Sequence, residues 1–363
     1  MLNDTIIRMQ PTGHLPARQP TRRIVAAWRR LTGGPSTRDS DRPTLIACSG
    51  GADSSALLLA LATTPAPLTV AHIIHDMRRP QAAQADALRV QELAATLGLP
   101  FVTDSIAARP HGGNLEAVSR QLRYAALATL ARSSGCRFIV TGHHAGDQAE
   151  TLLMRLMRGV GSRGVASIRS RRTLAEGIHV IRPMLALNRN DAEAICTAAQ
   201  WQWLTDATNT DPNFGLRSAI RHRLLPLIEE LRPGSTGAIA RSTDVLGRHA
   251  SAIEYAAKTV EALAARNSDN GGLSWKRECL RTVPAVVLMA ALRNASREPG
   301  GAAFWRTVAT AARDKKEHER IFEIGAVRIR IDANTLNIRW KGEPSTHSGS
   351  DAQSHPTIPE GLR

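Results

Sequence analysis

Residues 44–61 read TLIACSGGADSSALLLAL, and this stretch decides the fold of the chain. Its first residues, Thr44, Leu45 and Ile46, are typical of a short strand, and residues 56–61 are typical of a helix. A glycine-rich turn joins the two. Such a strand, turn and helix N-terminus form an anion-binding site, because backbone N–H groups and the positive end of the helix dipole converge there. The glycines let the backbone approach a phosphate closely.

The turn also carries polar side chains suited to a phosphate ligand. Ser49, Ser54 and Ser55 supply short hydroxyl donors, and Asp53 is a candidate metal ligand. An ordinary capped turn would explain a lone glycine pair. Here, however, the six successive residues 49–54 are glycine, serine, aspartate and one alanine, a composition that favours a phosphate site. Because the first lysine is Lys258, a Walker-type GxxxxGK loop is excluded from this half of the chain.

The spacing resembles SGGxDS, the signature of the PP-loop ATP pyrophosphatases, which cleave ATP to AMP and pyrophosphate. The resemblance implies that one continuous segment binds ATP: Ser49, Gly50, Gly51, Ala52, Asp53 and Ser54.

Composition favours a polyanionic partner. The 363-residue chain has a formal net charge of +15, and only five of its 47 basic residues are lysine. Such a charge favours RNA, DNA or an acidic membrane face, although a GC-rich genome also produces an excess of arginine. The four cysteines form no CxxC pair, which is typical of reduced thiols in a cytoplasmic protein. No apolar run is long enough for a membrane span, so we expect no membrane contact.

Alternating strand and helix patterns continue to about residue 200. This alternation predicts an α/β fold with a doubly wound parallel sheet, whose strands lie near residues 44–46, 68–74, 101–102, 137–141 and 178–181. A second, mostly helical domain with a terminal hairpin follows. We expect four regions: a basic, disordered extension with one amphipathic helix (1–42), a catalytic domain with the phosphate turn (43–234), the mostly helical domain (235–341) and a disordered tail (342–363).

A second polar segment, TGHHAGDQAETLLMRLMRG at 141–159, follows the fourth predicted strand. Taken alone, a helix cap made by Asp147 and Glu150 is its simpler explanation. Beside the first motif, however, it resembles the HHxxDQxETxLxxLxRG motif of the tRNA(Ile)-lysidine synthases. The resemblance implies that this chain is a short form of such an enzyme. Further matching pieces begin at His75, Asn114, Arg182, Asp206 and Arg217. One departure matters most: Gly146 stands where the family usually has an aspartate, which is the strongest sequence argument for an altered enzyme.

The resemblance implies a ligase that forms a carbon–nitrogen bond. ATP adenylates O2 of the wobble cytidine in the CAU-anticodon isoleucine tRNA, and the ε-amino group of free L-lysine then attacks C2, which changes decoding from AUG to AUA. ATP and Mg²⁺ are the implied cofactors, and homodimer formation is left open. We expect Asp53, His143 and Asp147 to be catalytic, with Asp53 and Asp147 holding Mg²⁺. The resemblance also implies that the mostly helical domain, residues 235–341, binds tRNA. The residues expected to contact tRNA are Arg120, Arg123, Arg155, Arg158, Arg217 and Arg221.

Two other functions fit the same motifs. A PP-loop tRNA thiolase is the nearest enzymatic alternative, but such enzymes typically need cysteine pairs. Gly146 instead suggests a second alternative, in which the chain is a homologue that binds ATP and tRNA but no longer catalyses the reaction.

Overall fold

The structure, a computed structural model, describes residues 18–76, 80–109, 115–159, 164, 168–205, 215–266, 272–315 and 318–341. Its contacts divide the chain into two compact units, Met1–Arg248 and His249–Arg363, and the division falls within one long helix. The tail expected after residue 341 lies outside the described residues. No helix in these ranges has the length and apolar character that crossing a membrane requires.

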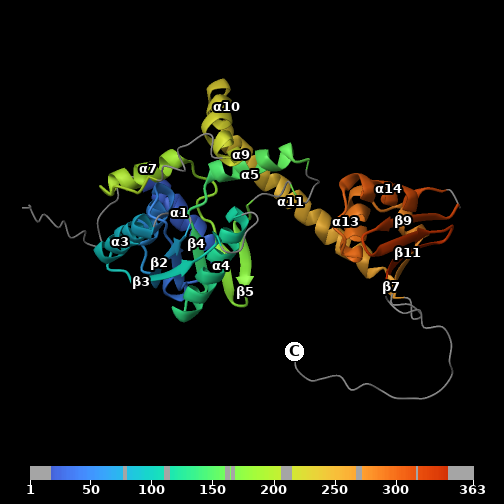
Figure 1. The fold of residues 1–363 in the computed structure, drawn as a ribbon, viewed down its shortest axis with the longest axis horizontal. Helices are drawn as coiled ribbons and strands as arrows, with labels where there is room; N and C mark the ends of the chain where they lie inside the picture. Colours follow the sequence, from blue (N-terminus) through green and yellow to red (C-terminus); the bar gives the residue numbers. More distant parts are fainter. Residues whose placement is uncertain are drawn as a thin grey trace, which may run out of the picture. The chain divides into compact units, whose positions relative to one another are not determined.

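The first unit is a three-layer α/β domain (Figure 1). Its six-stranded sheet has the order β3-β2-β1-β4-β6-β5, in which only the pairing of β5 with β6 is antiparallel. The strands are β1 (Thr44–Ala47), β2 (Leu68–His75), β3 (Phe101–Ile106), β4 (Phe138–Thr141), β5 (Arg171–Ala175) and β6 (Ile178–Ile181). The five parallel strands confirm the predicted doubly wound sheet, whereas the antiparallel edge strand β5 was not predicted.

Helices cover both faces of this sheet. The helices of this unit are α1 (Arg18–Leu31), α2 (Ala52–Leu61), α3 (Pro80–Thr96), α4 (Leu115–Ser133), α5 (Ala145–Met157), α7 (Arg189–Ala198), α9 (Gly215–Ala219) and α10 (Leu225–Leu231), with a π-helical turn at Ile220–Leu224. Consecutive strand residues face opposite cores. Ile46 packs with α1, α2, α3 and α7, whereas Leu45 packs with α4.

The one amphipathic helix expected within residues 1–42 is present as α1, whereas the disorder expected for the rest of this region does not extend to the described residues 18–42. Helix α1 buries Ile24 and Trp28 completely in the core of the domain. Trp28 Nε1 donates to Thr44 Oγ1 at 3.3 Å, at the start of β1. Arginines are frequent in this segment, and Arg22, Arg23, Arg29 and Arg30 lie on the exposed face of α1, whereas its apolar face makes the helix part of the domain.

The second unit combines helices with an antiparallel sheet of order β7-β8-β11-β10-β9 (Figure 1). The predicted terminal hairpin is its β10–β11 pair. Its elements are the end of α11 (Ser235–Ala262), β7 (Ala265–Arg266), β8 (Leu273–Lys276), α12 (Arg277–Arg281), α13 (Ala285–Ser296), α14 (Ala302–Arg313), β9 (Arg320–Ile324), β10 (Val327–Ile331) and β11 (Thr335–Trp340). One side of this sheet packs against α13 and α14 in a shared core. The unit is therefore richer in strands than its helical sequence pattern indicated.

Candidate active site

The phosphate-binding turn lies where the sequence placed it, between β1 and α2. Gly50 has φ +86°, a left-handed conformation that favours glycine. A Cβ at Gly50 would lie 2.5 Å from Leu204 Cδ1, so the turn also needs glycine for space. The N-cap of α2 is Gly51, which has no side chain to occupy the positive end of the helix. The backbone of this turn is thus shaped to receive an anion.

The serines organise the turn internally. Ser54 Oγ accepts from the backbone N–H of Ser49 at 3.1 Å and donates to Gly51 O at 3.1 Å. Ser49 Oγ lies 3.2 Å from Ser54 Oγ. Ser55 is completely buried, and its hydroxyl donates to Gly50 O at 3.3 Å. Ser54 and Ser55 therefore hold the shape of the turn, and Ser49, which is exposed, is the hydroxyl most accessible to a ligand.

Sheet order brings the second polar segment to this turn. The order in which the chain adds strands to the sheet reverses between the parallel neighbours β1 and β4. Ligands of open α/β sheets bind at the carboxyl ends of the strands at such a switch point. Gly142 follows β4 and packs directly on the first turn of α2. A Cβ at Gly142 would lie 2.9 Å from both the carbonyl carbon and oxygen of Asp53. The two motifs quoted from the sequence consequently form one site.

His144 lies between the two candidate catalytic carboxylates. Its Nε2 is 3.6 Å from Asp53 Oδ2 and 3.9 Å from Asp147 Oδ2. His144 is also the N-cap of α5: its Nδ1 accepts from the N–H of Gly146, and its own N–H donates to Asp147 Oδ2 at 2.9 Å. The sequence had suggested a cap formed by Asp147 and Glu150. The structure instead pairs His144 with Asp147, one turn earlier.

Glu150 is buried behind this group and holds two arginines. Arg217 Nε donates to its Oε2 at 2.8 Å, and Arg221 Nε donates to its Oε1 at 2.6 Å. Both guanidinium groups also lie near Asp147 Oδ1, at 3.4 and 3.6 Å. Arg221 belongs to the π-helical turn, a feature that is frequent at functional sites. The structure thus joins residues about 70 positions apart into one charged cluster.

Burial and neighbouring charges act differently on the two aspartates. Burial raises the pKa of Asp53 above its usual range, although His144 opposes this effect. Burial also acts to raise the pKa of Asp147, but His144, His143, a backbone N–H and Arg217 outweigh it and lower that pKa. Asp147 is therefore a stable anion, whereas Asp53 carries a charge that its surroundings oppose.

His143 occupies a different environment from His144. Burial lowers the pKa of His143 to about 3; Asp147 opposes the shift, and Arg182, Arg120 and Arg123 reinforce it. Its Nδ1 lies 2.8 Å from Thr141 Oγ1. His143 is thus a neutral, hydrogen-bonding group at neutral pH, which can orient a substrate but is a weak base.

Arg120 and Arg123 gather around Tyr124, a grouping that the sequence did not predict. Their guanidinium carbons lie 5.2 and 6.0 Å from the ring centroid, and that of Arg172 lies at 5.1 Å. The nearly buried Arg182 donates to the Tyr124 hydroxyl at 3.0 Å. Arg182 begins one of the matching pieces and Tyr124 lies in the piece that begins at Asn114, but nothing in their spacing indicated that they touch.

Two predicted tRNA-contacting residues lie away from this cluster. Arg155 donates to the backbone oxygen of Gly164, and Arg158 follows the end of α5. At 1.5 Å rise per residue, they are about 12 and 16 Å along the helix from Asp147. The motif beginning at Asp206 falls in residues 206–214, and Met77, Arg78 and Asn114 also lie outside the described residues.

The carboxylate of Asp53 is suited to bind a cation. Its Oδ1 is buried and accepts no hydrogen bond from the described residues. Those residues include no group of three His, Cys, Asp or Glu side chains that would form a protein-only metal site. Mg²⁺ is commonly held by one or two carboxylates together with substrate phosphates. Asp53 and Asp147 beside the phosphate turn match that pattern.

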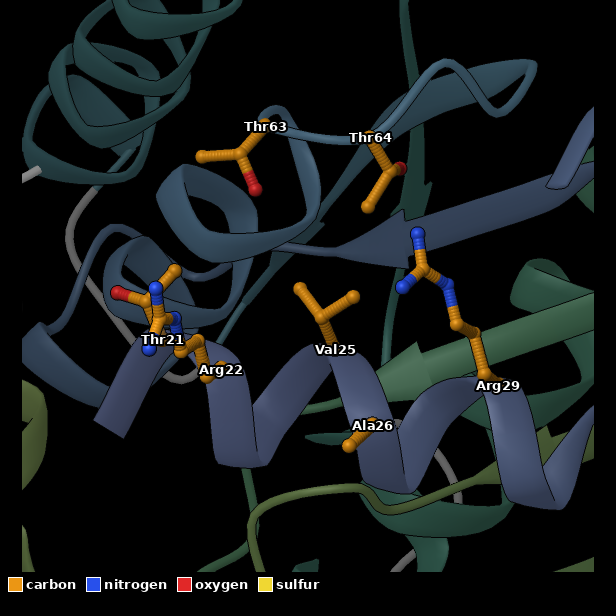
Figure 2. Close-up of a pocket in the computed structure, with 7 residues that line it drawn as sticks. All are labelled: Thr21, Arg22, Val25, Ala26, Arg29, Thr63 and Thr64. Carbon is orange, nitrogen blue, oxygen red and sulfur yellow. The ribbon is translucent and has the colours of Figure 1, made fainter. Parts of the chain in front are cut away.

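A hollow of about 340 Å³ lies elsewhere, beside α1 (Figure 2). Thr63 and Thr64, on one side of it, follow the last turn of α2, whereas the phosphate turn precedes the first. Helix α2 separates the two by its ten residues, about 15 Å. The hollow is therefore distinct from the candidate active site.

Comparison with known proteins agrees with this geometry. The PP-loop domain family matches residues 24–228, which include the latter part of α1, both motifs and the Glu150 cluster. The tRNA(Ile)-lysidine synthase of Bordetella parapertussis is 34% identical over 286 residues, covering 75% of this chain and 78% of that protein. The Geobacter sulfurreducens enzyme of the same name is 39% identical over 216 residues, but these cover 58% of this chain and only 45% of that protein.

A solved structure supports the fold alone. The U34-tRNA thiolase NcsA from Methanococcus maripaludis, with its [4Fe-4S] cluster, superposes with a TM-score of 0.50 at 15% identity. The match covers 64% of this chain and 78% of that one. The fold, the phosphate turn and the sequence relationship lead to the same conclusion: the chain uses the PP-loop fold and belongs to the tRNA(Ile)-lysidine synthase family.

Proposed function

We propose that this chain ligates free lysine to C2 of the wobble cytidine of a CAU-anticodon isoleucine tRNA, using ATP. Cytosine O2 attacks the α-phosphorus of ATP, and pyrophosphate leaves. The lysine ε-amino group then adds to C2, and the O2 atom leaves as part of AMP. The observation that carries this proposal is the contact of Gly142 with Asp53, which joins the phosphate turn to the His143–Glu150 segment in a member of this family.

The turn formed by Ser49 to Ser54 would hold the triphosphate. Its backbone and the N-terminus of α2 face a negative ligand, and Ser49 adds an exposed hydroxyl. Asp53 and Asp147 would hold Mg²⁺, which supplies neutralising charge to the phosphate oxygens when bound. Arg217 and Arg221 are kept in place by Glu150, so their remaining N–H groups are oriented before a substrate arrives.

We further propose that the remaining predicted arginines contact tRNA. Arg120 and Arg123 lie near His143 and would meet the anticodon base or its phosphates. Single-stranded anticodon bases are commonly recognised by stacking and by arginine contacts. Arg155 and Arg158, further along α5, would reach the backbone of a neighbouring nucleotide. Residues 235–341, the predicted tRNA-binding domain, would hold the body of the tRNA.

Gly146 favours one alternative, a chain that binds ATP and tRNA without joining lysine to the RNA. The two functions are separated by measuring pyrophosphate release with ATP, Mg²⁺, lysine and the CAU-anticodon isoleucine tRNA, each omitted in turn. Labelled lysine on the tRNA, with pyrophosphate release that requires tRNA and repeated turnover that requires lysine, is the expected result. ATP binding without turnover would instead support the binding protein.

A third outcome would show that a group other than lysine is the nucleophile. Pyrophosphate release that needs tRNA but leaves no lysine on it would preserve adenylation and reject lysine as the acceptor. A sulfur transfer reaction, the activity of the thiolase alternative, is disfavoured because the chain has no CxxC pair. In the described residues, Cys48, Cys136 and Cys196 are buried thiols in the first unit and Cys279 belongs to the second.

A further inference from the structure

His72 lies in β2 and contacts the residue that leads into the phosphate turn. The residue is only 6% exposed, and its Nδ1 lies 2.9 Å from the backbone oxygen of Cys48. Strand β1 ends at Ala47, so Cys48 is the point at which the chain leaves the strand. The N–H of Cys48 still donates to Ala71 O in β2, at 2.9 Å. A side chain of β2 thus binds the first carbonyl beyond the end of β1.

This hydrogen bond determines which ring nitrogen of His72 carries the hydrogen. A carbonyl oxygen can only accept, so Nδ1 must be the donor. Burial lowers the pKa of His72, the hydrogen bond to Cys48 and the charge of Asp86 oppose that shift, and His75 reinforces it. The ring is therefore neutral at neutral pH, and its one hydrogen is on Nδ1.

The peptide group between Cys48 and Ser49 is held on both sides. The C=O and N–H of a planar trans peptide point in opposite directions, and the described residues contain no cis peptide. His72 donates to the carbonyl of Cys48, and Ser54 Oγ accepts from the N–H of Ser49 at 3.1 Å. Because His72 belongs to β2 and Ser54 to α2, the plane of this peptide is fixed between the sheet and the helix.

Other carbonyl groups of the turn are bound by the protein in the same way. The backbone oxygens of two glycines accept hydrogen bonds from three residues: Gly50 O from Leu204 and Ser55, and Gly51 O from Ser54 and Ser55. By contrast, the N–H groups of residues 51–53 have no acceptor within the described part of the chain. Carbonyl dipoles bound to the protein and N–H groups left for a ligand favour an anion. His72 contributes by binding the first of these carbonyls.

We propose that His72 is a positioning residue of the ATP site, where its Nδ1–H holds the Cys48 carbonyl and thereby orients the turn that receives the phosphates of ATP. This inference rests on the proposed function, because it assigns a role within the same site. The competing explanation is that His72 only fills space in the core. Asparagine and leucine separate the two explanations. Asparagine can place an amide N–H near the position of Nδ1 but is smaller than histidine, whereas leucine fills the space and has no donor.

The experiment titrates the full chain with ATP and Mg²⁺ by calorimetry, without tRNA, and thermal unfolding checks that each variant is folded. The matched control is His179→Leu, because the Nδ1 of His179 is also hydrogen-bonded, to Thr173. His179 pairs with Phe138, the first residue of β4, at the end of the sheet opposite the phosphate turn. The net value of one hydrogen bond corresponds to about a five- to tenfold change in affinity. We therefore expect His72→Leu to raise the Kd for ATP by about that factor.

The asparagine variant distinguishes positioning from packing. His72→Asn should bind ATP within about twofold of the parent chain, because the donor to Cys48 is kept. His179→Leu should bind ATP like the parent. Parental affinity in His72→Leu would overturn the inference, as would a loss in His72→Asn as large as that in His72→Leu. Packing alone predicts the reverse order, since asparagine leaves more space unfilled than leucine does.

A measurement on the unaltered chain tests the assigned hydrogen directly. The imidazole nitrogen NMR resonances of His72, identified by their loss in His72→Asn, should place the hydrogen on Nδ1. A hydrogen on Nε2 would overturn the inference, and this test does not depend on whether His72→Leu folds. A parental chain that binds no ATP would remove the proposed function as well, an outcome distinct from one confined to the variants or to the ring.

Discussion

Gly142 lies against the backbone of Asp53, close enough that a single added carbon would reach 2.9 Å from the Asp53 carbonyl. The contact joins the loop after β4 to the first turn of α2, and through it every candidate catalytic group is positioned relative to the phosphate turn. Because the neighbouring atoms are backbone, they cannot rotate away as a side chain could. The distance between the two motifs therefore depends on glycine at this position.

Gly142→Ala should loosen the site and destabilise the domain. Inserting a methyl group into a tightly packed region typically costs about 1–3 kcal/mol. Since the displaced backbone belongs to Asp53, we expect the Kd for ATP in Mg²⁺ to rise as well. Thermal unfolding and calorimetric ATP titration measure the two effects. Gly237→Ala, whose added carbon would meet only the flexible end of Arg241, should change neither; ATP affinity unaffected by Gly142→Ala would contradict the assignment.

Asp53→Asn should stabilise the protein while weakening its binding of ATP with Mg²⁺. Burial raises the pKa of Asp53 in the folded chain, so between the unfolded and folded pKa values the folded chain binds more protons. The free energy of unfolding then falls as pH rises through that interval, and the cost is complete above the folded pKa. Asparagine removes that cost, which predicts a higher melting temperature than the parent's at pH 7–8.

The advantage of Asp53→Asn should shrink as the pH is lowered through the raised pKa of Asp53, because the parental carboxyl then becomes neutral too. Melting curves of both proteins from pH 3.5 to 8 test this, and Asp41→Asn, at an exposed position, is the control. An advantage that is constant with pH, or one that grows toward acid, would show that the charge of Asp53 is not what destabilises the fold.

Glu150→Gln should release both arginines from their common anchor. The carboxylate is 1% exposed, whereas the side chains of Arg217 and Arg221 are 32% and 27% exposed, so solvent partly screens the pairs. Breaking a fully buried pair costs about 3–5 kcal/mol, and we expect about 2–3 kcal/mol here. Urea unfolding measures the loss. Glu193→Gln, which breaks an exposed pair with Arg189, should cost less than about 1 kcal/mol. Equal costs for the two variants would contradict a buried anchor.

Trp28→Ala tests whether α1 is an integral part of the catalytic domain. Replacing a completely buried tryptophan by alanine typically costs about 3–5 kcal/mol. Trp28→Phe should cost less, because it keeps an aromatic ring in the core and loses only the pyrrole part of the indole with its hydrogen bond to Thr44. Arg30→Ala, on the exposed face of the same helix, should be nearly neutral in urea unfolding. If Trp28→Ala unfolded like the parent, α1 would be an independent extension.

The parallel sheet and the phosphate turn followed from local patterns. Strand and helix signals alternated along residues 44–199, and the turn before Ala52 carried glycine at the position where φ is positive. Such features depend on a few neighbouring residues, so the sequence alone could reveal them. It could also place both polar motifs at strand ends, where ligands bind in this class of fold.

The edge strand β5 and the first three strands of the second sheet escaped prediction for a physical reason. They are short strands with partly exposed residues, so their own patterns are weak, and β8 also depends on a partner far along the chain, β11. The amphipathic helix α1 was predicted, but its arginine-rich sequence did not show that its apolar face is part of the domain core. Strand propensity and helix amphipathicity are weak signals until tertiary packing selects the buried face.

By itself, the sequence of this protein determined the class of fold, the phosphate turn and the set of charged residues available to its site. Only the tertiary structure decided how those charges are used: it joined Glu150 to Arg217 and Arg221, and it placed His144 between Asp53 and Asp147. Local conformation depends on short-range sterics and hydrogen bonding, which the residues carry with them. The pairing of charges depends on which segments the sheet order brings together, and that order is set by packing of the whole domain.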